Sequence, residues 1–151
     1  MAKKSAGIIL YRTQNKFLEV FLVHSGGPFW TNKDEGAWSI PKGEFEDEDP
    51  LSAAKREFEE ETGVKISGKF IELKPVKQKS GKLIYAWAVE GDIDPSKINS
   101  NEFEIEWPPH SGKMKSFPEI DKAAWFDLDG AAKKIIEGQL LFLKELDIKL
   151  R

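Results

Sequence analysis

The residues best suited to chemistry lie in the carboxylate-rich segment GEFEDEDPLSAAKREFEEETGV, residues 43–64. Successive residues of an α-helix turn by about 100°, so Glu57, Glu60 and Glu61 share one helical face and Glu59 points away. Hard cations such as Mg²⁺ prefer oxygen ligands, and Mg²⁺ completes its shell with water and substrate phosphates. Two interpretations are open at this point: a solvated acidic face, which is common on helices, or a site for a divalent cation.

The helix that carries these carboxylates has clear predicted limits. Asp49 suits the N-cap and Pro50 the first helical position, while Gly63 follows the last turn. The apolar residues that recur at helical spacing are Leu51, Ala54 and Phe58. Because this buried stripe neighbours the carboxylate face, we expect the carboxylates at the edge of the core.

The flanking segments predict the elements that must position this helix. Strand patterns cover residues 5–12, 17–25, 38–44, 64–78, 81–90 and 123–128. Residues 91–119 are polar and proline-containing, and we expect a long loop that could act as a lid. Residues 129–150 predict two helical segments broken at Gly138, with Asp129 as a candidate cap. Strands interleaved with helices indicate an α/β domain with a mixed sheet.

Composition narrows the class of protein. The chain has 151 residues, 40% of them hydrophobic, so we expect one domain over residues 1–151. It has no cysteine, which excludes disulfides and thiol catalysis. A net charge of −3 does not favour nucleic acid as a partner. No apolar stretch is long enough for a signal peptide or a membrane span, so the expected compartment is the cytoplasm.

The same residues resemble the sequence box of the Nudix hydrolase family. That box reads Gly, five residues, Glu, seven residues, then Arg-Glu-apolar-x-Glu-Glu-x-Gly-apolar, and REFEEETGV at residues 56–64 matches its second half. Glu48 stands eight residues before Arg56, as in the family. The chain departs from the box at its front, where four residues rather than five separate Gly43 from Glu48. Either the loop is shorter here, or Asp49 or Glu46 takes the place of the loop glutamate.

The resemblance implies an α/β/α sandwich with a mixed β-sheet and a metal-dependent pyrophosphohydrolase that cleaves a diphosphate linkage in a nucleoside diphosphate derivative. The implied cofactor is Mg²⁺ or Mn²⁺. Its expected ligands are the Gly43 carbonyl, Glu57, Glu60 and Glu61. Arg56 is expected to orient Glu60 and Glu48. The general base stays open between Glu60 and a downstream acid, for which the candidates are Glu102, Glu104 and Glu106.

The substrate is less well defined by the sequence. The segment WSIPKGE and its flanking strands resemble the subgroup that cleaves diadenosine polyphosphates, in which a downstream tyrosine stacks on the base. Tyr85 is the nearest match, although a core position is also open to it. Phe29 and Trp30 lie in the loop before the box and could stack on a base, and Lys42 could meet phosphates. The alternatives are a housecleaning pyrophosphatase for nucleoside triphosphates or nucleotide sugars, and a non-catalytic nucleotide-binding module. The sequence does not decide between a monomer and a dimer.

Overall fold

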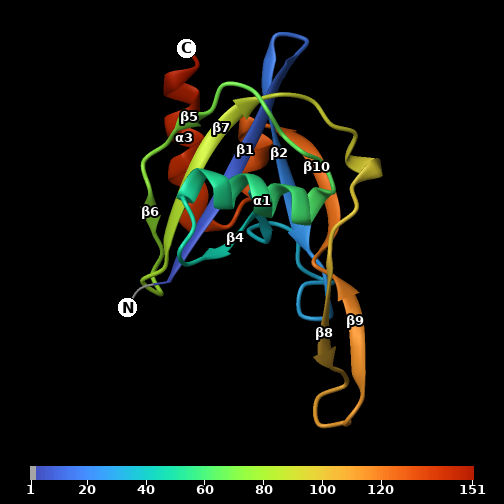
Figure 1. Ribbon diagram of the computed structural model, residues 1–151. Helices are drawn as coiled ribbons and strands as arrows, with labels where there is room; N and C mark the ends of the chain where they lie inside the picture. The colour runs from blue at the N-terminus through green and yellow to red at the C-terminus, as the bar shows by residue number, and fades with distance from the viewer. Residues whose placement is uncertain (1–2) are drawn as a thin grey trace.

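The computed structural model of the chain describes residues 3–151 and shows a mixed eight-stranded sheet with helices on both faces (Figure 1). The strand order is β10-β2-β1-β7-β5, with β3 paired to β2, β4 to β1 and β6 to β7. Strands β1 and β7 are parallel, and the other pairs are antiparallel. The bounds of the sheet strands are β1 Lys4–Gln14, β2 Phe17–Ser25, β3 Trp38–Ser39, β4 Lys42–Phe45, β5 Ile71–Glu72, β6 Val76–Lys77, β7 Leu83–Glu90 and β10 Ile120–Asp127.

Three α-helices cover the sheet: α1 (Pro50–Thr62), α2 (Leu128–Lys134) and α3 (Leu140–Lys149). Short 3-10 turns occupy Pro95–Lys97 and Glu137–Gln139. Within residues 3–151, no helix has the length and apolar character needed to cross a membrane.

The alternation of side chains along the central strands divides the core into two halves. On β7, Trp87 and Val89 are buried with α1, whereas Ile84, Ala86 and Ala88 are buried with α2 and α3. A strand sends successive side chains to opposite faces of the sheet. A central strand with apolar residues at both odd and even positions can therefore pack against helices on both faces. The predicted α/β/α sandwich with a mixed sheet is therefore confirmed.

Helix α1 begins and ends where its sequence predicts. The Asp49 side chain accepts a hydrogen bond from the amide of Ser52, and Pro50 is the first helical residue. Gly63 adopts φ +78°, and its amide bonds to the carbonyl of Glu59. Phe58 is fully buried against the sheet, where its truncation to alanine would cost about 3–5 kcal/mol.

Part of the segment predicted as a loop over residues 91–119 is instead a β-hairpin, so that prediction was wrong. Strands β8 (Glu102–Glu106) and β9 (Met114–Pro118) pair antiparallel in a separate two-stranded sheet that projects from the domain (Figure 1). The turn between them includes His110 and Gly112, both with positive φ. The alternation of acidic and apolar residues in EFEIE is a period-2 strand pattern, and it agrees with the other interpretation of Glu102, Glu104 and Glu106 from the sequence, an acidic surface strand.

The C-terminal region also differs from its prediction. The cap of α2 is Asp127, which accepts from the amide of Gly130, and Asp129 lies inside the first turn. The helical segments part at Ile135, which has an extended backbone, and Gly138 lies in the 3-10 turn that follows. The side chain of Ile135 is buried in the core, at the same residue where helix α2 ends.

Candidate catalytic site

The site is built where α1 crosses strand β4. Gly43 pairs with Ala6 of β1, and a Cβ placed on Gly43 would lie 2.0 Å from Oε2 of Glu57. Real Cβ atoms do not approach another heavy atom this closely, so only glycine leaves room for the carboxylate. The Glu57 carboxylate therefore rests directly against the backbone of residue 43.

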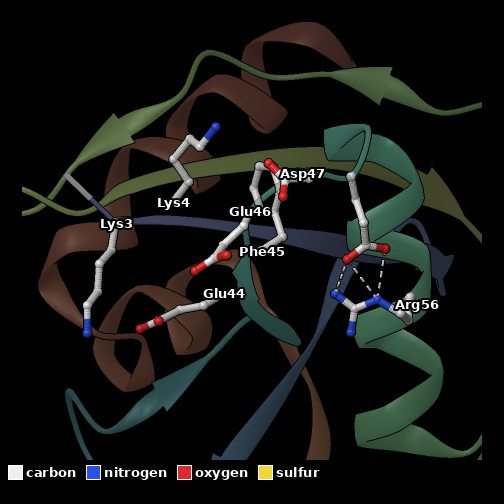
Figure 2. Close-up of a pocket in the computed structure, with 8 residues that line it drawn as sticks. Lys3, Lys4, Glu44, Phe45, Glu46, Asp47 and Arg56 are labelled. Carbon is white, nitrogen blue, oxygen red and sulfur yellow. Dashed lines mark hydrogen bonds and ion pairs between the residues drawn. The ribbon is translucent and has the colours of Figure 1, made fainter. Parts of the chain in front are cut away.

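Arg56 joins the helix carboxylates to the loop before the helix. Its Nη1 donates to Glu57 Oε1 at 2.9 Å and to Glu60 at 3.2 Å, while its Nε donates to Glu48 at 2.9 Å. Figure 2 shows this arginine beside residues 44–47, at the end of β4 and in the loop that follows, with which it lines a hollow of about 700 Å³. Among the acids considered for the loop position, Glu48 is the one bonded to Arg56, and Asp49 caps the helix instead.

Glu61 lies on the other side of Glu57 and contacts β4. Its Oε1 accepts a hydrogen bond of 3.3 Å from the amide of Lys42. Burial, and then the charge of Glu57, raises the pKa of Glu61 to about 8. Burial and the charge of Glu60 likewise raise the pKa of Glu57. These carboxylates crowd one another, and Arg56 bonds to only two of the three.

A further acid that sequence reasoning missed is Glu119, between β9 and β10. The amide of Asn101 donates to the carbonyl of Glu60, and the amide of Glu119 donates to the carbonyl of Asn101. Partial burial, and then the charge of Glu60, raises the pKa of Glu119. The charge of Glu119 also contributes to the raised pKa values of Glu57 and Glu61. The sequence around Glu119 gives little indication that it belongs to the site, since a single acidic residue before a strand is common.

The three downstream acids proposed as bases lie on the projecting hairpin. Glu102 accepts from the hydroxyl of Ser116, and Glu106 accepts from two amides of the hairpin turn. Glu104 is exposed opposite Ser116. Glu119, rather than these three, is the downstream acid whose charge contributes to the raised pKa values of Glu57 and Glu61.

The predicted substrate-binding residues are distributed over two parts of the molecule. Lys42 lies beside Glu61, and burial, followed by the charge of Lys82, lowers its pKa. Tyr85 is partly buried and packs edge-on against Phe45 at the border of the core beneath α1. Phe29 and Trp30 lie in the β2–β3 loop, and among residues 3–151 neither has a ring contact with Tyr85.

That loop is fixed to the sheet by a buried histidine. His24 Nδ1 lies 2.7 Å from Asp121 Oδ1, and Nε2 lies 2.7 Å from the carbonyl of Lys33. The imidazole also packs edge-on against Trp38, whose Nε1 donates to Asp34. His24 therefore holds both ends of the loop and has a structural role.

The donor chemistry of the site fits a divalent cation. Within residues 3–151, no three His, Asp or Glu side chains already enclose a position for an ion, and Arg56 bridges Glu57 and Glu60. The carboxylate oxygens that gather beside a glycine backbone are nevertheless those that Mg²⁺ and Mn²⁺ prefer. A cation here would also offset the mutual repulsion that raises the pKa values of Glu57 and Glu61.

Comparisons with known proteins agree with this architecture. The family model described as the NUDIX domain matches residues 1–146, so the chain belongs to the Nudix hydrolase family. The prediction of a Nudix pyrophosphohydrolase is confirmed at the level of the family. No curated protein matches the chain.

Solved structures share the fold at low sequence identity. The NUDIX domain of Shewanella oneidensis NrtR, complexed with ADP ribose, has a TM-score of 0.69 at 15% identity, covering 100% of this chain and 90% of that one. The C. elegans Ap4A hydrolase in a binary complex has a TM-score of 0.66 at 20% identity, covering 97% of both chains. A mutT/nudix family protein from Listeria innocua has a TM-score of 0.64 at 17% identity, covering 98% of this chain and 93% of that one.

Proposed function

We propose that the protein hydrolyses a diphosphate linkage in a dinucleoside polyphosphate or a related nucleotide. The observation that carries this proposal is the placement of Glu57 against the Gly43 backbone and of Glu61 on the amide of Lys42, with Arg56 bonded to Glu57 and Glu60 on the same helix. A polyphosphate is strongly anionic, so a carboxylate site can accept it only with cations between the two. Glu57, Glu60, Glu61 and the Gly43 carbonyl would hold Mg²⁺ or Mn²⁺, which neutralises phosphate charge and lowers the pKa of bound water.

The roles of the protein's own groups follow from their positions. Water adds to phosphorus, the bridging P–O bond breaks, and the leaving phosphate keeps the electron pair. Glu119 takes the proton of the water, because its raised pKa brings it nearer to neutral pH, where a general base works best. Glu60 is the second candidate for this role. Arg56 keeps Glu60 and Glu57 oriented, and Lys42 contacts the phosphates.

The test is a substrate panel in Mg²⁺ and in Mn²⁺: diadenosine polyphosphates, nucleoside triphosphates, nucleotide sugars and ADP-ribose. We expect turnover of diadenosine polyphosphates, and Glu60→Gln should retain the fold while losing at least about a hundredfold in kcat. The matched control is Glu59→Gln, which removes an exposed carboxylate from the same helix. Wild-type turnover by the Glu60 variant would overturn the assignment of Glu60.

Nucleoside triphosphates, nucleotide sugars and ADP-ribose are the second substrate class. The structural likeness to a NUDIX domain complexed with ADP ribose favours including ADP-ribose in the panel. Turnover of these compounds without turnover of dinucleotides would replace the first proposal. Binding of nucleotides with no turnover would indicate a binding module.

A further inference from the structure

The buried imidazole of His24 lies between two hydrogen-bond acceptors. Its Nδ1 is 2.7 Å from a carboxylate oxygen of Asp121, and its Nε2 is 2.7 Å from the carbonyl oxygen of Lys33. Neither an ionised carboxylate nor a carbonyl has a proton to donate, so each contact needs an N–H from the ring. A neutral imidazole has one N–H, whereas the imidazolium has two. The arrangement around His24 therefore suits the doubly protonated ring.

The charges around His24 leave Asp121 as its counterion. The charged side chains on the elements packed against the ring are Asp121 and Lys122 of β10, Lys33 and Asp34 of the β2–β3 loop, and Lys134 of α2. Asp34 is bonded to Lys134 and to the indole of Trp38, so its carboxylate is already satisfied. Within residues 3–151, the ion pair of Asp121 is the one with His24. The His24 side chain is fully buried, where a charge is tolerated only with a partner of this kind.

A β-bulge in β10 supplies the carboxylate to the ring. Ile120 pairs with Ser25 and Lys122 pairs with His24, so Asp121 is the extra residue between two pairs of the strand register. An extra residue of this kind bends the strand and redirects a side chain. The bulge thus places Asp121 as well as Lys122 opposite His24, and Asp121 contacts the imidazole.

The same segments hold the acid proposed as the general base. The amide of Gly26, two residues after His24, donates at 2.8 Å to the carbonyl of Glu119, two residues before Asp121. A Cβ on Gly26 would lie 2.0 Å from the carbonyl oxygen of Pro118, so the two backbones are in close contact. The end of β2 therefore binds the start of β10 at two points, the backbone of Glu119 and the side chain of Asp121.

We propose that His24 carries a proton on each ring nitrogen and that its ion pair with Asp121 positions Glu119 for catalysis. His24 is then a positioning residue, because it acts through residues 119–121 and contacts no reacting group. Loss of one ring proton would turn a nitrogen lone pair toward an acceptor oxygen and loosen this segment. The positioning role rests on the proposed function, in which Glu119 is the base, whereas the protonation of the ring can be measured without any reaction.

NMR measures the protonation of the ring directly. The chain has two histidines, so a long-range ¹H–¹⁵N correlation spectrum contains two imidazoles, and His110→Asn assigns them by removing the exposed one. At about pH 7.5, where an unperturbed imidazole is mostly neutral, we expect both ring nitrogens of His24 to carry a proton.

Asp121→Asn is the matched variant for this measurement. The asparagine amide can donate to Nδ1 of a neutral ring, while Nε2 keeps its bond to the carbonyl of Lys33. The variant should therefore melt like wild type, but its His24 should carry one ring proton at the same pH.

The pH dependence of kcat tests the positioning role. In wild type, kcat should fall at alkaline pH together with the loss of the second ring proton seen by NMR, whereas Asp121→Asn should lack this fall. His24→Gln should lower kcat by about tenfold to a hundredfold, the range expected for a misplaced catalytic group, with KM within about twofold of wild type. His110→Asn should retain the wild-type profile.

The outcomes separate this inference from the hydrolysis itself. A single ring proton on His24 in an active wild-type protein would overturn the inference and leave the hydrolysis standing. Identical pH profiles of kcat for wild type and Asp121→Asn would overturn the positioning role. A doubly protonated ring in a wild-type protein that turns over no substrate would support the ion pair and refute both the hydrolysis and the positioning of a base.

Discussion

Replacement of Glu61 by glutamine should stabilise the metal-free protein at alkaline pH while weakening its response to Mg²⁺. The Glu61 carboxyl is held beside Glu57 at the edge of the core, and its pKa rises from 4.5 to about 8. Glutamine keeps the oxygen that accepts from the Lys42 amide but cannot ionise. The substitution thus removes the unfavourable charge and little of the packing.

The size of the effect follows from proton linkage. Between pH 4.5 and 8 the folded state holds a proton on Glu61 that the unfolded state has lost, so the free energy of unfolding falls as pH rises. Each pH unit lowers the free energy of unfolding by at most about 1.4 kcal/mol, and the whole interval lowers it by at most about 5 kcal/mol. Because the side chain is partly exposed, solvent screening reduces this total, and we expect about 2–3 kcal/mol.

Urea unfolding of wild type and Glu61→Gln from pH 5 to pH 9 in EDTA checks this prediction. The two proteins should have equal free energies of unfolding near pH 5. Above that pH, the variant should become steadily more stable than wild type. Added Mg²⁺ at a hundred times its dissociation constant should stabilise wild type by about 2.7 kcal/mol and the variant by less. Glu59→Gln, the exposed control, should follow wild type throughout. Parallel stability curves for wild type and the Glu61 variant would refute the reasoning.

Three further substitutions test other contacts of the site. Gly43→Ala should reduce kcat by at least tenfold and lower the melting temperature, because its Cβ would occupy the place of a carboxylate oxygen 2.0 Å away; activity and melts near those of wild type would contradict this. Arg56→Gln should cost about 1–3 kcal/mol at pH 7 in urea unfolding, and less at pH 5, where the crowded acids are partly protonated. Glu119→Gln should lower kcat by about 10²–10⁴ in a steady-state assay, whereas Glu104→Gln should leave it unchanged, and the reverse order would restore Glu104 as the base.

The helix and its carboxylate face could be predicted because their determinants are local. The Asp49 cap, the Gly63 terminus and the spacing of Glu57, Glu60 and Glu61 depend on backbone geometry within a few residues. The bonds from Arg56 to Glu48 and Glu60 span eight and four residues, so they too lie within reach of a local argument.

The features that sequence reasoning missed depend on contacts between distant segments. Glu119 is linked to the helix through Asn101 by two backbone hydrogen bonds, which no local pattern specifies. The contact of Phe29 with Trp107 joins residues on two loops whose mutual placement no local pattern specifies. Strand alternation left both a binding position and a core position open to Tyr85, and its contact with the distant Phe45 leaves it partly buried at the border of the core.

The hydrogen bonds of Arg56 reach only part of the carboxylate cluster. Two of its nitrogens are committed to Glu48, and the third divides its bonds between Glu57 and Glu60. Glu61 has an amide donor but no bond to the guanidinium, and burial, followed by the charge of Glu57, raises its pKa. A second guanidinium would have neutralised the cluster and stabilised the apoprotein, but it would also have occupied the space that a phosphate-bridging cation needs. Ionisation of Glu61 is thus unfavourable in the folded state, and a bound cation would offset that cost, which links stability and chemistry at one residue.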